Sequence, residues 1–410
     1  MGVLAINGGK PIRTEGWPAW PPDDPGFLEN LTAVIDSGTW GTGGEWTEKA
    51  AEMMADYHDA KYGVPVANGT TALELALRAV GVEPGHEVIV PPYTFVATAS
   101  SVVATGAIPV FVDIDEATFN LDPGLIEQAI TERTKAITAV HIGGSPADMD
   151  PIMAIAKKHD LAVIEDACQA HGAIYKGRKV GAIGDAAGFS FQSSKNVTAG
   201  EGGMVLTNSR EIYEHVWSTV NVGRVQNGEW YDHRVMGWNY RLTQFQGALL
   251  CRGMELLPEH FALRAGNGDH LRARLAEVEG VSLQELTDEA NVSAFHLYIF
   301  SYDPEAFGGL PRAKFLPALA AEGIRGSTGY NPLYREGVFA NACDRTKFPF
   351  APRYYDGDVD YSKVSCPACE RVCDQTGFWM SQSTGLSDEK GMDDIADAIL
   401  KIQANVGEIE

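Results

Sequence analysis

Short apolar runs alternate with helix-forming segments between residues 60 and 210, and this alternation constrains the fold more than any other feature of the sequence. A helical segment at 72–81 precedes the run HEVIVPPYTF at 86–95, and a helical segment at 150–160 precedes the run LAVIEDACQA at 161–170. Short, near-continuous apolar runs separated by helices are typical of a mostly parallel sheet covered on both faces. The sequence therefore predicts an α/β fold in which ligands bind beyond the carboxyl ends of the strands.

The pattern changes in the last third of the chain. After residue 255 we expect a long helix interrupted by Gly266 and Gly268, then a strand, a further helix and a final amphipathic helix. This order predicts a large domain over residues 1–255, with the N-terminal segment included, and a smaller α+β domain over residues 256–410.

Charge and composition exclude several classes of protein. The formal net charge of -23 gives a surface that repels phosphate backbones, so we expect no nucleic-acid partner. No apolar run is long enough for a membrane helix, and the N-terminus has no signal-peptide pattern, so a cytoplasmic protein is expected. The cysteines in CPACERVC, residues 366–373, match only half of a zinc site, and we expect buried thiols and no metal.

Four features stand where strands are expected to end or helices to begin. Gly69 and Thr70 open a helix, where amides and hydroxyls can bind an anion. Phe95 follows one expected strand, Asp166 closes another, and Lys195 follows a third, just before the glycine-rich AGEGG. Taken singly, each has an ordinary structural explanation, as a helix cap, a core aromatic, a buried acid or a surface lysine.

Together these features meet the chemical needs of pyridoxal 5'-phosphate (PLP). Its phosphate binds amides and hydroxyls, and its planar ring stacks on a flat neighbour. An acid partner keeps the ring nitrogen protonated, so that the ring serves as an electron sink. Its aldehyde forms a Schiff base with an amine. An anion cradle, an aromatic, a carboxylate and an amine in this chain order therefore predict a PLP site.

The sequence resembles the fold-type I PLP-dependent transferases of the DegT sugar aminotransferase family. The resemblance covers nearly the whole chain, is weaker after residue 256, and rests on the motifs NGTTALELAL, VIVPPYTFVATA, EDACQAHGA, SFQSSKNVTAGEGGMVLTN and GWNYRLTQFQGAL. The chain is most similar to the branch that aminates cyclitol ketones such as scyllo-inosose, and somewhat less similar to the aminohydroxybenzoate synthases. The resemblance implies a mostly parallel sheet flanked by helices and a smaller C-terminal α+β domain.

The resemblance also assigns roles to residues of the catalytic centre. Lys195 matches the lysine that forms the Schiff base with the cofactor, and Asp166 matches the acid paired with the pyridine nitrogen. Gln169 matches a polar residue near the phenolic oxygen of the cofactor and the substrate. Phe95 matches the aromatic that stacks on the ring.

Further matches concern the cofactor phosphate. Gly69, Thr70 and Ser190 match phosphate contacts within the subunit. Asn239, in the motif NYR, matches an asparagine that reaches the phosphate of the neighbouring subunit, which implies a homodimer with two shared sites.

The substrate pocket is less closely specified. Four polar residues are expected to line it, with a purely structural role as the alternative: Gln192, His296, Tyr330 and Tyr334. Gln192 stands where nucleotide-sugar enzymes commonly have histidine, which favours a substrate without a nucleotide. Gly143 and Gly144 replace larger residues of many relatives, and they either widen the pocket or fit a different neighbour.

Because Lys195 is present, where some relatives carry histidine and dehydrate sugars, the resemblance favours transamination. We expect glutamine or glutamate to donate an amino group to a keto-cyclitol or keto-sugar. Three alternatives stay open: an aminotransferase for nucleotide-linked sugars, a PLP-dependent dehydratase or aromatising synthase of the aminohydroxybenzoate type, and a non-catalytic regulator with the same fold.

Overall fold

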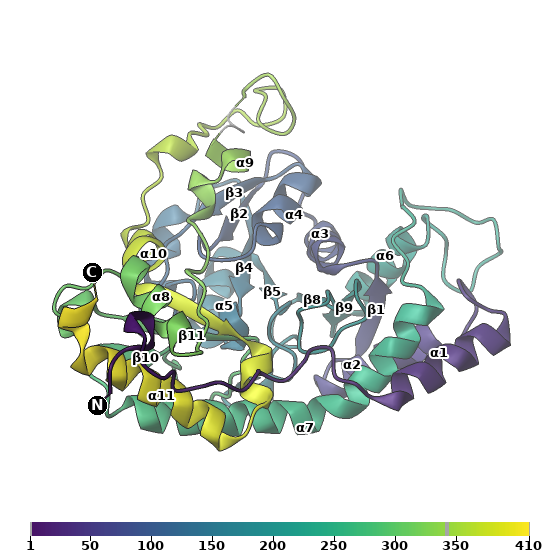
Figure 1. Ribbon diagram of the computed structural model, residues 1–410. Helices are drawn as coiled ribbons and strands as arrows, with labels where there is room; N and C mark the ends of the chain where they lie inside the picture. Colours follow the sequence, from purple (N-terminus) through teal and green to yellow (C-terminus); the bar gives the residue numbers. More distant parts are fainter. Residues whose placement is uncertain (1, 341–343, 410) are drawn as a thin grey trace.

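A seven-stranded sheet forms the centre of the molecule in the computed structural model, which describes residues 2–340 and 344–409 (Figure 1). Its strand order is β1-β9-β8-β5-β4-β2-β3, and β8, β5, β4, β2 and β3 run parallel. Strand β9 is antiparallel to both of its neighbours. The strands are β1 Tyr62–Val66, β2 Glu87–Val90, β3 Ile108–Phe111, β4 Thr134–Val140, β5 Ala162–Asp166, β8 Ala186–Ser190 and β9 Gly203–Thr207. The predicted mostly parallel α/β sheet is confirmed.

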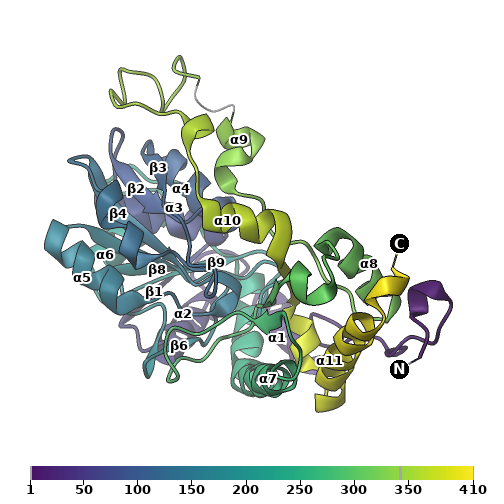
Figure 2. The same ribbon diagram turned by 90° about the vertical axis from the view of Figure 1, so that its left-hand side faces the viewer.

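Helices cover both faces of this sheet, because the strands bury apolar side chains on both sides. One apolar core joins one face to α3, α4 and α6, and a second core joins the other face to α2, α5 and α7 (Figure 2). These helices are α2 Trp46–Tyr57, α3 Gly69–Ala79, α4 Ala97–Thr105, α5 Met149–His159, α6 Arg210–Val220 and α7 Gln244–Leu275. A further helix, α1 Pro25–Ser37, packs against α7.

The C-terminal part has its own core around an antiparallel sheet of β10 Val281–Leu283, β11 Leu297–Tyr302 and β12 Gly377–Ser381. Helices α8 Arg312–Ala321 and α11 Glu389–Ala404 pack on it. The short helices α9 Gly337–Ala340 and α10 Pro367–Arg371, which lie between α8 and β12 in the chain, pack instead in a core of the large sheet. The N-terminal segment also packs here: Leu4 lies in this core and Arg13 pairs with Asp394 at 2.9 Å. The smaller C-terminal α+β part is confirmed.

Helix α7 differs from the expectation that two glycines would interrupt it. It runs unbroken from Gln244 to Leu275, and Gly266 and Gly268 both lie inside it. Tertiary packing explains the difference, because α7 lies against α2 at one end and α11 at the other, which outweighs the weak helix propensity of glycine. The proposed boundary at residue 255 falls within this helix and stays a prediction.

No helix in the described part of the chain is long and apolar enough to cross a membrane. Within those ranges there is also no group of three histidine, cysteine or acidic side chains that could hold a metal ion. Cys369 and Cys373 lie buried with their sulfur atoms 3.8 Å apart, and Cys366 is buried nearby.

Candidate active site

Lys195 lies in the turn that follows β8, where its backbone amide donates to the Gln192 carbonyl at 2.9 Å. Its amine has no hydrogen-bond partner among residues 2–340 and 344–409. Burial lowers the pKa of the amine, and the nearby thiol of Cys168 and carboxylate of Asp166 oppose this shift without cancelling it. A half-buried amine that loses its proton more easily than an exposed lysine suits a nucleophile.

Asp166 closes β5 at the carboxyl edge of the sheet and is almost fully buried. Its Oδ2 accepts a hydrogen bond from the Thr98 hydroxyl at 2.7 Å, and its Oδ1 accepts one from the Cys168 amide at 3.2 Å. A residue distant in sequence, Thr98, and the local turn at Cys168 therefore fix the carboxylate together. The arrangement presents an acid to the space beyond the sheet edge, near Lys195.

The N-terminus of α3 forms a tight cradle with the end of β8. The Asn68 side chain caps the helix by accepting the Thr71 amide at 2.9 Å. A Cβ on Gly69 would lie 2.6 Å from the Ser190 Cβ and 3.1 Å from the Cys168 sulfur, so only glycine fits there. Positive helix-terminal amides and a serine hydroxyl thus meet in one place, as a phosphate requires.

Thr70 extends this cradle. It is the second residue of α3 and is exposed, so its hydroxyl is free to meet a ligand outside the helix end. The structure therefore brings together all three residues expected to bind phosphate within the subunit: Gly69, Thr70 and Ser190. Their role as phosphate ligands stays a prediction.

Gln169 joins the large sheet to the C-terminal part. Its Oε1 accepts the Gly143 amide at 2.7 Å, and its Nε2 donates to the Tyr330 hydroxyl at 2.9 Å. Since the first bond fixes the orientation of the amide, the Tyr330 oxygen acts as acceptor and its own proton stays available. Burial raises the pKa of Tyr330 to about 12, so the phenol remains neutral and can donate.

The two glycines expected either to widen the pocket or to fit a different neighbour do the latter. Gly143 has a φ of +67°, and a Cβ there would lie 2.7 Å from the Ile299 side chain. Gly144 has a φ of +94°, and a Cβ there would lie 2.8 Å from the Gln169 carbonyl oxygen. Their small size lets this loop contact β11 closely.

Phe95 lies one residue before the N-cap of α4, and its side chain is 56% exposed. The neighbouring Tyr93 is buried instead, at 5.4 Å from the Tyr330 ring. An exposed aromatic at the sheet edge, followed one helical turn later by the Thr98 that holds Asp166, is free to stack on a planar ligand.

His296 lies within the electrostatic range of Lys195, and its Nδ1 is 3.3 Å from the Asn196 Oδ1. Burial and the nearby Lys195 charge hold the pKa of His296 well below its usual value, so its ring is neutral. His171, which the sequence did not single out, is also buried near Lys195, and burial holds its pKa well below the usual value. Its place in EDACQAHGA was the available signal.

Thr98 and Cys168 were also missed. Thr98 lies in the motif VIVPPYTFVATA, three positions after Phe95, and Cys168 lies in EDACQAHGA, next to Gln169. The spacing of Thr98 from Phe95, one helical turn, is the only signal that could have pointed to it.

Two residues expected in the substrate pocket, Gln192 and Tyr334, hydrogen-bond to other residues of the chain. The Gln192 side chain bonds to Ser193 and Ser194 within its own turn. Tyr334 is buried, donates to Glu370 at 2.6 Å and packs on Phe111, and no contact joins it to Lys195 or Asp166 in the described residues.

Asn239 lies exposed on the long segment between α6 and α7. The next residue, Tyr240, accepts a hydrogen bond from the Ala67 amide at 2.7 Å, which anchors this segment beside the start of α3. The contact between Asn239 and the phosphate site of a neighbouring subunit stays a prediction.

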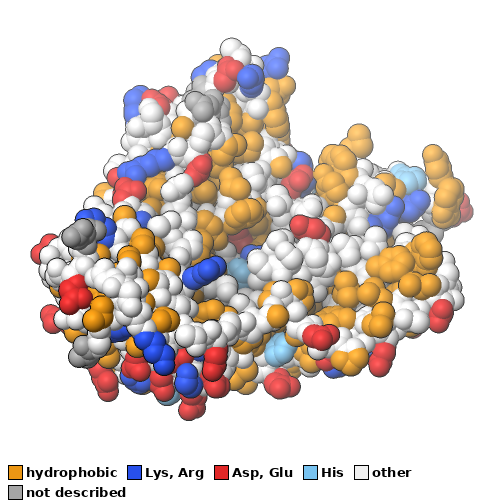
Figure 3. All heavy atoms as spheres, in the orientation of Figure 1, with side chains coloured by type: hydrophobic (Ala, Val, Ile, Leu, Met, Phe, Trp, Pro, Cys, Tyr) orange, Lys and Arg blue, Asp and Glu red, His pale blue; other side chains and the backbone are white. Residues whose placement is uncertain are grey.

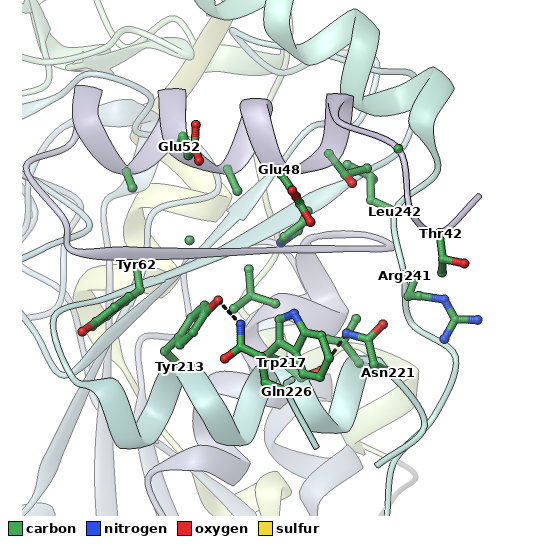
Figure 4. Close-up of a pocket in the computed structure, with 18 of the residues that line it drawn as sticks. Thr42, Glu48, Glu52, Tyr62, Tyr213, Trp217, Asn221, Gln226, Arg241 and Leu242 are labelled. Atoms are coloured by element: carbon green, nitrogen blue, oxygen red, sulfur yellow. Dashed lines mark hydrogen bonds between the residues drawn. The ribbon is translucent and has the colours of Figure 1, made fainter. Parts of the chain in front are cut away.

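A separate cavity of about 510 Å³ lies between α2, β1 and α6. Figure 4 shows Glu48 on α2 and Trp217 on α6 on opposite sides of it, with Tyr213 bound to Gln226 at 2.8 Å. None of the residues around Lys195 lines this cavity. We place the candidate active site at Lys195, because the lysine, the fixed carboxylate and the anion cradle converge there.

The residues around Lys195 fit PLP on the evidence of their chemistry. A glycine-only cradle suits the phosphate, a fixed carboxylate suits the ring nitrogen, an exposed aromatic suits the ring, and an unpartnered amine suits the aldehyde.

Several known proteins are similar to this chain in sequence and in fold. A model of the DegT/DnrJ/EryC1/StrS aminotransferase family matches residues 22–374. The L-glutamine:2-deoxy-scyllo-inosose aminotransferase of Streptoalloteichus tenebrarius is 38% identical over 99% of both chains. The L-glutamine:scyllo-inosose aminotransferase of Streptomyces griseus is 37% identical, also over 99% of both chains. The crystal structure of 3-amino-5-hydroxybenzoic acid synthase, 32% identical, superposes with a TM-score of 0.85 over 96% of this chain and all of that one.

Proposed function

The chain belongs to the DegT/DnrJ/EryC1/StrS aminotransferase family, and from this premise we propose that it transfers an amino group from L-glutamine or L-glutamate to a keto-cyclitol. The observation that carries this proposal is the unpartnered, half-buried amine of Lys195 beside the fixed carboxylate of Asp166. A non-catalytic regulator would have no need of an amine whose pKa burial lowers.

PLP, when bound here, supplies an aldehyde for amines and a protonated ring that withdraws electrons from the reacting carbon. Lys195 would hold the aldehyde, and its amine, when free, would move a proton at the donor's α-carbon. Asp166 would hold the proton on the ring nitrogen. Gly69, Thr70 and Ser190 would bind the phosphate, and Phe95 would lie against the ring.

The polar groups of Gln169 and Tyr330 suit a hydroxylated ring substrate. Because Tyr330 accepts from Gln169, its own proton can be donated to a substrate or cofactor oxygen. His296 is neutral and buried near Lys195, where it can bind a further hydroxyl. Glutamine and a deoxy-inosose are named for the Streptoalloteichus tenebrarius relative, which supports an amino-acid donor and a cyclitol acceptor.

We further propose a homodimer in which Asn239 reaches the phosphate cradle of the partner. The segment around Asn239 exposes large apolar side chains, among them Trp230 at 75% and Met236 at 84%. Figure 3 shows hydrophobic side chains gathered at the end of the molecule where Figure 1 places α1 and this segment. Monomers rarely expose contiguous apolar patches of this kind. A second copy covering this surface would also cover the cavity of Figure 4, which the same segment helps to line.

Mixing two inactive variants tests the shared site. Lys195→Ala and Asn239→Ala homodimers are each expected to be inactive or strongly impaired. A mixed dimer of the two regains one complete site, with the lysine from one chain and the asparagine from the other. Activity that reappears on mixing supports the shared site, and two variants that stay inactive after proven subunit exchange contradict it.

The absorption spectrum with PLP tests the reaction. Purified protein should show the band that PLP acquires when its aldehyde is linked to a lysine, and Lys195→Ala should lack it. L-glutamine or L-glutamate should bleach the band, and scyllo-inosose or 2-deoxy-scyllo-inosose should restore it.

The structural likeness to 3-amino-5-hydroxybenzoic acid synthase favours one second candidate, an aromatising synthase. That reaction would yield an aromatic absorbance from an amino-cyclohexenone without an amino donor. If no band forms with folded protein, the assignment of Lys195 is wrong. A band that no amino donor bleaches refutes transamination.

A further inference from the structure

Helix α4 is tied to the acid of the active site by a chain of buried hydroxyls. The Thr98 side chain is fully buried, and its Oγ1 lies 2.7 Å from Oδ2 of Asp166. The Thr94 Oγ1 lies 2.9 Å from the Thr98 Oγ1, and Thr94 is also buried. The three oxygens form one connected series of hydrogen bonds.

The direction of these bonds follows from the chemistry of the groups. An ionised carboxylate can only accept, so the single Thr98 proton is committed to Asp166. The bond between the two threonines therefore runs from Thr94 to Thr98. Each hydroxyl thus polarises the next, and the series ends on the carboxylate with a charge-assisted bond.

The second carboxylate oxygen is fixed from another direction. Oδ1 of Asp166 accepts the Cys168 amide at 3.2 Å, from the turn that follows β5. A carboxylate oxygen has two acceptor sites, so one donor on each oxygen leaves room for a ligand N–H. Donors on both oxygens hold the plane of the carboxylate.

The same turn of chain also presents Phe95. The Thr98 amide donates to the Phe95 carbonyl at 3.1 Å, so the ring and the hydroxyl are held one helical turn apart. A change that displaces the Thr98 side chain would therefore act on both the carboxylate and the exposed aromatic.

We propose that Thr98, oriented by Thr94, is a positioning residue that keeps the Asp166 carboxylate aimed at the ring nitrogen of PLP. The inference rests on the proposed function, because it assigns Asp166 to that nitrogen. Thr98 touches neither the substrate nor the reacting atoms and acts through the carboxylate.

Loss of the Thr98 hydroxyl removes the donor that holds Oδ2 of Asp166. The carboxylate is then held at Oδ1 by the Cys168 amide, so it can turn away from the ring nitrogen, and PLP binding weakens.

The test compares PLP affinity in four variants of the full-length protein. Thr98→Val keeps the shape and removes the donor, and we expect it to bind PLP roughly 10- to 100-fold more weakly, the effect of losing a hydrogen bond to a charged group. Thr98→Ser should recover most of the affinity, and Thr94→Val should lie between.

Thr105→Val is the matched control, because Thr105 is a buried threonine of the same helix. Its hydroxyl donates only to the Val102 carbonyl, at 2.7 Å. It should bind PLP as the unchanged protein does. If Thr98→Val binds PLP as tightly as Thr105→Val, the inference is wrong.

Two checks separate this outcome from others. If the unchanged protein forms no lysine-linked PLP band, the proposed function itself fails and the inference fails with it. If Thr98→Val does not fold, Thr98→Ser and Thr94→Val still decide: normal PLP affinity in Thr94→Val contradicts the series of hydroxyls, and weakened affinity supports it.

Discussion

Substitution by alanine is expected to change the stability of the protein differently at Gly266 and Gly268, which lie two positions apart in the last third of α7. Gly266 is exposed, and a Cβ there would have no heavy atom within 4 Å. Gly268 is buried, and a Cβ there would lie 2.2 Å from Cζ of the Phe295 ring. Gly266→Ala is therefore expected to stabilise the protein and Gly268→Ala to destabilise it relative to that variant.

The difference between the two variants isolates the packing cost. Both gain the helix propensity of alanine over glycine, about 1 kcal/mol, so this gain cancels in the comparison. To relieve the clash, the Phe295 ring would have to move by about 1.3 Å, from 2.2 Å to the 3.5 Å of an ordinary carbon contact. The ring cannot move freely, because it stacks on Tyr298 at 4.6 Å. Overpacking of this kind costs about 1–3 kcal/mol.

Thermal unfolding at fixed protein and PLP concentrations measures this difference, since both self-association and cofactor binding shift Tm. At roughly 2–4 °C per kcal/mol for a domain of about 150–250 residues, Gly268→Ala should melt roughly 2–12 °C below Gly266→Ala. Equal melting temperatures would refute the argument, because they would mean that Phe295 has room to move. Because Phe295 adjoins Ala294, whose carbonyl accepts from Asn196 at 2.7 Å, Gly268→Ala should also weaken PLP binding.

Three further predictions concern the site and its support. Burial lowers the pKa of Lys195 from 10.5, so the rate of PLP linkage, followed by stopped-flow absorbance, should have its midpoint below pH 10.5, and Asp166→Asn should lower that midpoint further because the carboxylate raises this pKa. Gly144→Ala would place a methyl 2.8 Å from a backbone oxygen and should lower both Tm and PLP affinity, whereas Gly309→Ala, with a similar φ of +81° and open space, should lower Tm only slightly. Burial alone would raise the pKa of Glu165, but hydrogen bonds to its carboxylate outweigh this and lower it, so Glu165→Gln should cost about 2–3 kcal/mol near neutral pH. A group with a lowered pKa contributes stability that is lost as the pH falls through its folded pKa, so this deficit should shrink below pH 4.5 in urea unfolding, and a constant deficit would contradict the assignment.

The sequence by itself determined the main sheet and the ends of its strands. The alternation of apolar runs and helices predicts strands that end at Asp166 and just before Lys195, and the structure has them there. Parallel strands bring their carboxyl ends to one edge, so these residues had to meet. Local signals sufficed because the side chains concerned follow directly from the strands that carry them.

Contacts between distant segments were decided only by the tertiary structure. Thr98 and Asp166 are 68 positions apart, and Gln169 and Tyr330 are 161 positions apart. No periodicity or spacing encodes such pairs, since they depend on how α4 and the C-terminal part settle against the sheet.

The same reason explains where the sequence reading differed from the structure. Gly266 and Gly268 carry a local preference against helix, yet α7 continues through them because both of its ends are packed. Gly143 and Gly144 do not open space in the site, because β11 and the segment before it fill that space. Local propensity is worth about 1 kcal/mol per residue, and the burial of a long helix or a close loop outweighs it.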